Sequence, residues 1–330
     1  MASQNLSRRT FLKGAAATGL IALLHPSIAF AENIPADDFT LVEKSLPKDL
    51  IALKRFLTPP NTLPPSNELL INVGRLPELV YNITVQKQES KVVVIIPESL
   101  GSAFILNKEG FFLSAYHVFA DQVEKQEKED LSSTALMYES NTGKVASART
   151  LMYSKQHDIF LGRVKFPESS HIEEMHLSPY NCNSPDLVWT VSYGKDTPIL
   201  NSLLKEILES GKFIYPEEVY PKKEASAASF QQVHPVKKES SFFQPLISIG
   251  HVVDVLTTEG KPVYAKEEYA FLHKAKYGDS GSPVFDVRER VQGIMTHMQN
   301  LSDENGEKQG VGIFVGQAPI RAMIEKYIVS

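Results

Sequence analysis

Cysteine is nearly absent from this sequence of 330 residues, which contains only Cys182. A single cysteine excludes an intramolecular disulfide, an iron–sulfur cluster and a zinc site built from several cysteines. No pair of histidines has a spacing typical of metal ligands, so we expect neither a metal nor a cofactor. The chain must be stabilised by packing, and its 42% of hydrophobic residues can supply a sizeable core.

The sequence also has no excess of positive charge: it contains 34 basic and 39 acidic residues, and its formal net charge is −5. A nucleic-acid-binding surface requires a basic excess, so we expect no nucleic-acid partner. No segment beyond the N-terminal region has the length of an apolar transmembrane helix. We therefore expect no stable membrane insertion once that region is removed.

Residues 1–31 have the pattern of an export signal. The paired Arg8 and Arg9 open it, an apolar run over residues 14–24 follows, and an Ala-Phe-Ala cleavage site ends at Ala31. Paired arginines before a mildly apolar, Gly- and Ala-rich segment resemble the twin-arginine signal, whose export machinery carries folded proteins. The alternatives are an amphipathic N-terminal helix or a retained anchor. We expect cleavage after Ala31 and a periplasmic or secreted bacterial protein.

Short β-like runs dominate the remaining chain, while sustained helical periodicity is mostly missing. The runs are rich in Val, Ile, Phe and Tyr and are separated by Gly, Pro, Asn, Asp and Ser, which is typical of an antiparallel barrel or sandwich. Two helices are expected, a short amphipathic one over residues 50–56 and a C-terminal one over about 319–328. The clearest strand predictions are Val80–Val85, Val92–Ile96, Ala103–Leu106, Phe111–Ala115, Ile159–Val164, Leu187–Tyr193, His251–Leu256, Val284–Phe285, Val291–Met295 and Val311–Val315.

The pattern divides the mature chain into an extension, a main domain and an insertion. Residues 32–69 form an N-terminal extension that ends in a Pro-rich linker, and residues 70–330 form the main domain. Residues 201–240 interrupt this domain with a Lys-rich segment that is either functional or disordered.

The sharpest chemical signal is the sequence Gly-Asp-Ser-Gly around Ser280. The glycines allow a tight turn that exposes the Ser280 hydroxyl, and the amides of Gly278 and Ser280 can point together at a developing oxyanion. Alone this motif is more often an ordinary surface turn. Its chemistry requires an imidazole that accepts the hydroxyl proton and a carboxylate that orients the imidazole.

Two further blocks supply these groups. A predicted hairpin over residues 101–119 carries His117 at the end of its second strand, and Asp158 opens the apolar strand that continues to Val164. The order along the chain is His, Asp, Ser.

These blocks resemble the trypsin-like, chymotrypsin-fold serine endopeptidases, especially the bacterial branch of HtrA-like and V8-like enzymes. The resemblance implies an all-β fold of two six-stranded antiparallel barrels, over about 78–175 and 185–316, with the active site between them. Only fifty residues follow Ser280, so we expect no PDZ domain of the HtrA type. The matching pieces are Gly101–Leu106, Ser114–Val118, Asp158–Val164, Leu187–Gly194, Gly250–Val255, Gly278–Phe285, Gly293–Ile294 and Gly310–Val315.

Carried over by position, the resemblance implies that Ser280 attacks a peptide carbonyl. His117 is then the general base, Asp158 orients it, and Gly278 and Ser280 form the oxyanion hole. Polypeptides are the implied substrates.

Three more residues are candidate substrate-binding positions. Lys274 falls near the floor of the family's specificity pocket and would favour an acidic side chain if it pointed inward. Thr296 falls where the family usually has a serine whose hydroxyl supports the aspartate. His297 lies two residues beyond the histidine position of the glutamyl enzymes, so a glutamyl preference is not supported.

Two other functions fit the same residues. One is an exported binding protein that keeps the barrels without activity, and the other is an esterase on the same scaffold. A further hypothesis is that residues 32–69 or the 201–240 insertion cover the cleft.

Overall fold

The structure is a computed structural model of the chain. The signal peptide, the Pro-rich linker beyond residue 58, the 201–240 insertion and Lys274 lie outside the residues that it describes. The described residues are 34–42, 50–58, 78–88, 91–95, 100–127, 133–138, 145–164, 174–183, 186–192, 246–253, 268–272, 278–302 and 308–329.

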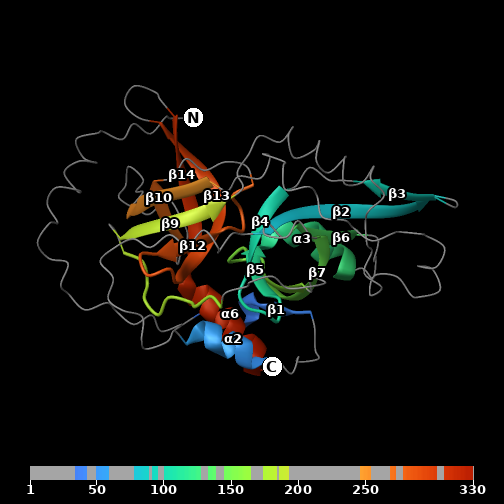
Figure 1. Ribbon diagram of the computed structural model, residues 1–330, viewed down its shortest axis with the longest axis horizontal. Coiled ribbons are helices and arrows are strands. Elements are labelled where there is room, and N and C mark those ends of the chain that lie inside the picture. The colour runs from blue at the N-terminus through green and yellow to red at the C-terminus, as the bar shows by residue number, and fades with distance from the viewer. Residues whose placement is uncertain are drawn as a thin grey trace, which may run out of the picture.

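The second half of the chain forms a closed, six-stranded antiparallel barrel, which lies on the left of Figure 1. Neighbouring strands follow the order β10, β11, β14, β13, β12 and β9, and β9 pairs again with β10. The strands are β9 (Leu187–Ser192), β10 (Leu246–Val253), β11 (Glu268–Leu272), β12 (Pro283–Asp286), β13 (Val291–Ser302) and β14 (Lys308–Gly316).

The first half forms an antiparallel sheet in which β7, β6, β2, β4, β5 and β8 are neighbours. Pairing of β7 with β8 closes these six strands into a ring, while β1 adds to β7 and β3 to β2. The predicted all-β fold is therefore confirmed. The strands are β1 (Thr40–Leu41), β2 (Glu78–Gln88), β3 (Lys91–Ile95), β4 (Leu100–Ile105), β5 (Phe111–Ala115), β6 (Ser133–Tyr138), β7 (Val145–Ser154) and β8 (Ile159–Val164).

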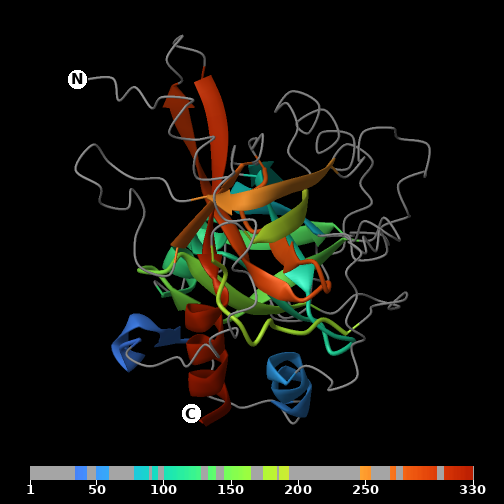
Figure 2. The same ribbon diagram turned by 90° about the vertical axis from the view of Figure 1, so that its left-hand side faces the viewer.

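Two of the helices are those that the sequence predicts, α2 (Leu50–Leu57) and α6 (Gln317–Val329). The sequence did not predict α3 (Tyr116–Glu127) or the short 3-10 helix η1 (Ala36–Asp38). Figure 2 shows α6 flanked by the two blue N-terminal pieces, η1 with β1 on one side and α2 on the other. In the described part of the chain, no helix combines the length and the apolar character needed to span a membrane.

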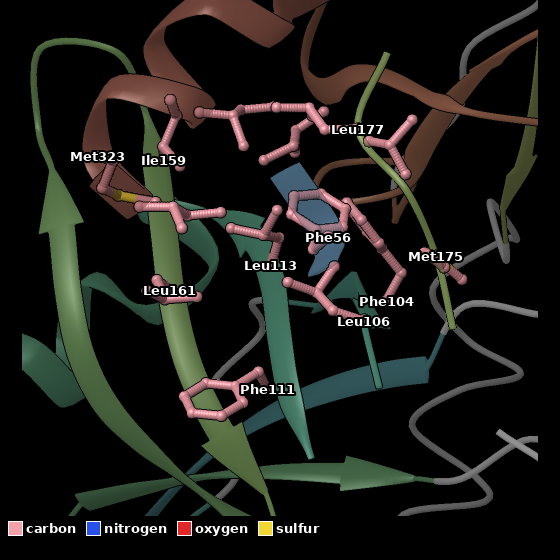
Figure 3. Packing of buried hydrophobic residues seen from close by; sticks show 14 of the residues in the cluster. Phe56, Phe104, Leu106, Phe111, Leu113, Ile159, Leu161, Met175, Leu177 and Met323 are labelled. Carbon is pink, nitrogen blue, oxygen red and sulfur yellow. The ribbon is translucent and has the colours of Figure 1, made fainter. Parts of the chain in front are cut away.

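The largest hydrophobic cluster lies between the two rings of strands and is closed by these helices. Figure 3 shows Phe56 from α2 and Met323 from α6 among side chains of the first sheet. Phe56 is 1% exposed, and the backbone carbonyl of Phe56 accepts the N–H of Leu177 at 2.8 Å. Arg321 of α6 donates to the Leu57 carbonyl at 3.3 Å. Helix α2 of the N-terminal extension is thus part of the core.

Replacing Phe56 by alanine is expected to lower the free energy of unfolding by about 3–5 kcal/mol, because it leaves a cavity in this cluster. Ile51 on the same helix is 63% exposed, so Ile51→Ala is the matched control and should change stability by less than about 0.5 kcal/mol. Urea unfolding followed by Trp189 fluorescence measures both. Equal, small effects would contradict the docking of α2.

Candidate active site

His117 and Asp158 lie next to each other at one end of two paired strands, β5 and β8. His117 is the second residue of α3, which begins directly after the buried strand β5, and Asp158 ends the turn between β7 and β8. The Asp158 carboxylate contacts His117 twice: Oδ2 lies 2.7 Å from Nδ1, and Oδ1 accepts the backbone N–H at 2.9 Å. Because a carboxylate only accepts hydrogen bonds, Nδ1 carries the proton and Nε2 of the neutral ring can accept one. The His117 side chain is 49% exposed, so a substrate can reach it.

The backbone of Asp158 has an unusual conformation. Its φ of +53° lies in the left-handed region, which non-glycine residues rarely adopt and aspartate tolerates better than most. The Asp158 carbonyl accepts the N–H of Tyr116 at 3.1 Å. Both the main chain and the side chain of Asp158 are therefore tied to the first turn of α3.

Ser280 lies in a tight turn just before β12. The turn uses positive φ values at Gly278 (+97°) and Gly281 (+87°). A Cβ on Gly281 would lie 1.9 Å from the carbonyl oxygen of Ser102, so only glycine fits there. The Ser280 side chain is partly buried, and its hydroxyl donates to the Thr296 carbonyl at 3.0 Å.

The structure thus brings His117 and Asp158 into contact and directs the Ser280 hydroxyl at a backbone carbonyl. Within the described residues, no hydrogen bond joins Ser280 to His117. Two other side chains in the second half of the chain are excluded as nucleophiles. The Ser282 hydroxyl is fully buried and has no partner among the described residues. Burial raises the pKa of the Cys182 thiol, which therefore stays protonated inside the second barrel.

A buried serine links the two rings of strands at this turn. Ser102 of β4 is 0% exposed; its hydroxyl donates to the Gly278 carbonyl at 2.9 Å, and its N–H donates to the Ser280 carbonyl at 2.7 Å. The Ser114 hydroxyl in turn donates to the Ser102 carbonyl at 2.7 Å. The sequence analysis gave Ser102 no role. A polar side chain within the otherwise apolar stretch Gly101–Leu106 was the signal that could have identified it.

The three candidate substrate-binding residues differ in their surroundings: Thr296 is buried, His297 is exposed, and Lys274 is not described. The Thr296 hydroxyl donates to the Ile313 carbonyl at 3.2 Å and lies 3.1 Å from His297 Nδ1. The expected contact between Thr296 and Asp158 is therefore not made. The reason is that the bulge in β13 between Met295 and His297 leaves Thr296 buried against β14. His297 is exposed, and Lys274 lies outside the described residues.

A closed barrel, a second ring of strands and a glycine turn at their junction place the chain among the two-barrel β proteins. The sequence model of the trypsin-like peptidase domain matches residues 101–294, more than half of the chain, and the chain belongs to this family. The model of the twin-arginine translocation signal matches residues 5–25, so the protein is exported across the membrane. No individual curated protein matches the chain significantly.

Proposed function

We propose that this exported peptidase is a serine endopeptidase that uses His117, Asp158 and Ser280. The two-point contact between His117 and Asp158 carries the proposal, because it leaves Nε2 of the imidazole as a base. Ser280 Oγ forms a bond to the carbonyl carbon of the substrate while its proton passes to Nε2. The same proton then goes to the leaving amine as the C–N bond breaks. Water completes the cycle by hydrolysing the acyl-enzyme, with His117 again as base.

The Ser280 hydroxyl must turn from the Thr296 carbonyl toward His117 before it attacks. This rotation breaks one hydrogen bond, whose net contribution is about 0.5–1.5 kcal/mol. That cost is small beside the barrier of the chemical step, so the observed position of the hydroxyl is compatible with an active enzyme.

The oxyanion of the tetrahedral intermediate would be bound by the amides of Gly278 and Ser280. Donors of this kind contribute about 3–4 kcal/mol each in other hydrolases, provided that they are held in place before the reaction. Ser102 supports this requirement, since it fixes the carbonyl of Gly278 and the carbonyl of Ser280 at once. Relative to this carbonyl, the direction of the Gly278 N–H is set by the two backbone dihedral angles of Gly278, of which φ is +97°.

The proposal is tested by labelling purified residues 32–330 with a fluorophosphonate and by mapping the bonds cleaved in an unfolded proteome. Labelling at Ser280 together with peptide-bond cleavage would support the endopeptidase. Labelling with ester hydrolysis alone would indicate the esterase. Failure to label would favour the inactive binding protein.

Ser102→Ala is expected to lower kcat about tenfold and to change KM little, because it frees the Gly278 carbonyl without removing an oxyanion donor. Ser178→Ala is the matched control, since Ser178 is also a buried, hydrogen-bonded serine but contacts Asp286. Steady-state kinetics on a peptide substrate compare the two. Equal kcat values in both variants would contradict the role of Ser102.

A further inference from the structure

The segment of residues 34–42, here called the strap, lies outside the part of the chain that matches the peptidase family. The strap contains η1 and β1 and packs on the first ring of strands. β1 extends the sheet by pairing with β7, with Thr40 opposite Tyr153. The N–H of Val42 donates to the Leu151 carbonyl at 2.9 Å. The strap therefore joins the strand that leads into the turn bearing Asp158.

The strap is also fixed from its other side. The Phe39 side chain is 4% exposed and belongs to the cluster between the rings of strands. Lys326 of α6 donates to the Phe39 carbonyl at 2.8 Å. Figure 2 shows this blue segment beside the red helix α6. The strap is thus held by β7 on one side and by α6, at the carboxyl end of the described chain, on the other.

Two side chains of the strap contact His157, the residue directly before Asp158. Asp38 Oδ2 lies 3.3 Å from His157 Nε2, and both side chains are nearly buried, with 12% and 10% exposed. The Phe39 ring stacks on the imidazole of His157 at a centroid distance of 5.9 Å and an interplanar angle of 26°. On the turn itself, the His157 N–H donates to Ser154 Oγ at 3.1 Å.

These contacts with His157 affect Asp158, the next residue, whose backbone is strained. A non-glycine residue at a φ of +53° costs energy and persists only where its surroundings determine its conformation. One side of Asp158 is held by α3, through its contacts with Tyr116 and His117. The other side is held through His157, whose own partners are Asp38 and Phe39.

We propose that the strap is a positioning element for the catalytic acid: Asp38 and Phe39 fix His157, and this fixes the conformation of Asp158 that orients His117. The proposal rests on the proposed function and deepens it. The strap is fixed by β7 and α6 and in turn supports the turn that carries Asp158. In this proposal, residues 34–42 position the site rather than cover the cleft.

Asp38→Ala tests the proposal, because it removes the contact with His157 and leaves the buried Phe39 in place. We expect kcat to fall about tenfold with KM nearly unchanged, and Asp38→Asn, which keeps an oxygen acceptor, to retain more activity. The matched control is Asp37→Ala in the same turn of η1, because Asp37 is exposed. It should leave kcat at the wild-type value. Wild-type kcat in Asp38→Ala would overturn the proposal.

A double-mutant cycle separates positioning from general loosening of the fold. If the strap acts through Asp158, Asp38→Ala should have no further effect on kcat in the Asp158→Asn background. A tenfold loss that persists there would show a merely structural role and overturn the proposal. Fluorophosphonate labelling of the wild type keeps the two proposals apart. An unlabelled wild type rejects the serine mechanism, whereas a labelled wild type with insensitive Asp38 variants rejects the strap alone.

Discussion

Ser280→Ala is expected to abolish fluorophosphonate labelling and to lower peptide hydrolysis by about six orders of magnitude. The variant lacks the oxygen that forms the acyl bond, and within the described residues no second nucleophile lies beside it. The Ser282 hydroxyl is buried, and burial raises the pKa of the Cys182 thiol. Intact-mass spectrometry after labelling measures the first effect, and a fluorogenic peptide measures the second.

The fold of this variant should survive. In the structure the Ser280 hydroxyl makes one hydrogen bond, to the Thr296 carbonyl, so its removal should cost about 1 kcal/mol of stability. Ser282→Ala is the control only two residues away. It removes a hydroxyl that makes no hydrogen bond among the described residues, and it should label like the wild type. If Ser280→Ala labels as well as Ser282→Ala, Ser280 is not the nucleophile.

Much of the fold could be predicted from the sequence, because short local patterns of apolar residues and turn residues indicate most of its strands. The hairpin of β4 and β5 has two apolar strands joined by a turn at Gly110, whose φ is +81°, but it ends at Ala115, and His117 lies in the helix that follows rather than at the end of the strand. The C-terminal helix shows one apolar face and a proline in its first turn. Each of these signals lies within about fifteen residues of chain.

Helix α3 escaped prediction because its apolar positions are few. Only Val118, Phe119 and Val123 belong to the interior of the first ring of strands, and the rest of the helix is mainly polar. Phe119 and Val123 are four residues apart, as on one face of a helix, but two such positions within little more than one turn are too few to establish a helical period. The helix is determined instead by tertiary packing, with the Phe119 ring stacked on Phe160 at 4.1 Å.

The contacts that position the site could not be predicted from the sequence because they join residues that are far apart along the chain. Ser102 reaches Gly278 across 176 positions, and Asp38 reaches His157 across 119. A two-residue strand such as β1 has no periodicity, and an isolated buried serine looks like any other polar residue. The candidate triad could be proposed from the sequence because its three short blocks are characteristic in combination. The residues that contact those blocks have no characteristic sequence pattern.

Asp158→Asn is the second variant with a large expected effect, a loss of about four orders of magnitude in kcat. The reason is the two-point contact. The carboxylate accepts from both the His117 N–H and Nδ1, but an amide has only one oxygen. If that oxygen accepts the backbone N–H, the amide NH₂ faces Nδ1 and holds the imidazole in the opposite tautomer. The proton then sits on Nε2, which can no longer take the proton of Ser280.

The same substitution should leave the fold nearly intact, which makes the loss of activity interpretable. Asparagine tolerates a φ of +53° as well as aspartate does, so the turn keeps its conformation. Single-turnover labelling and kcat on one peptide measure the effect, with exposed Asp37→Asn as the control. A kcat within tenfold of wild type would contradict the tautomer argument. Asp158→Ala should in addition lose stability, because alanine pays the cost of the left-handed conformation without the carboxylate's two hydrogen bonds.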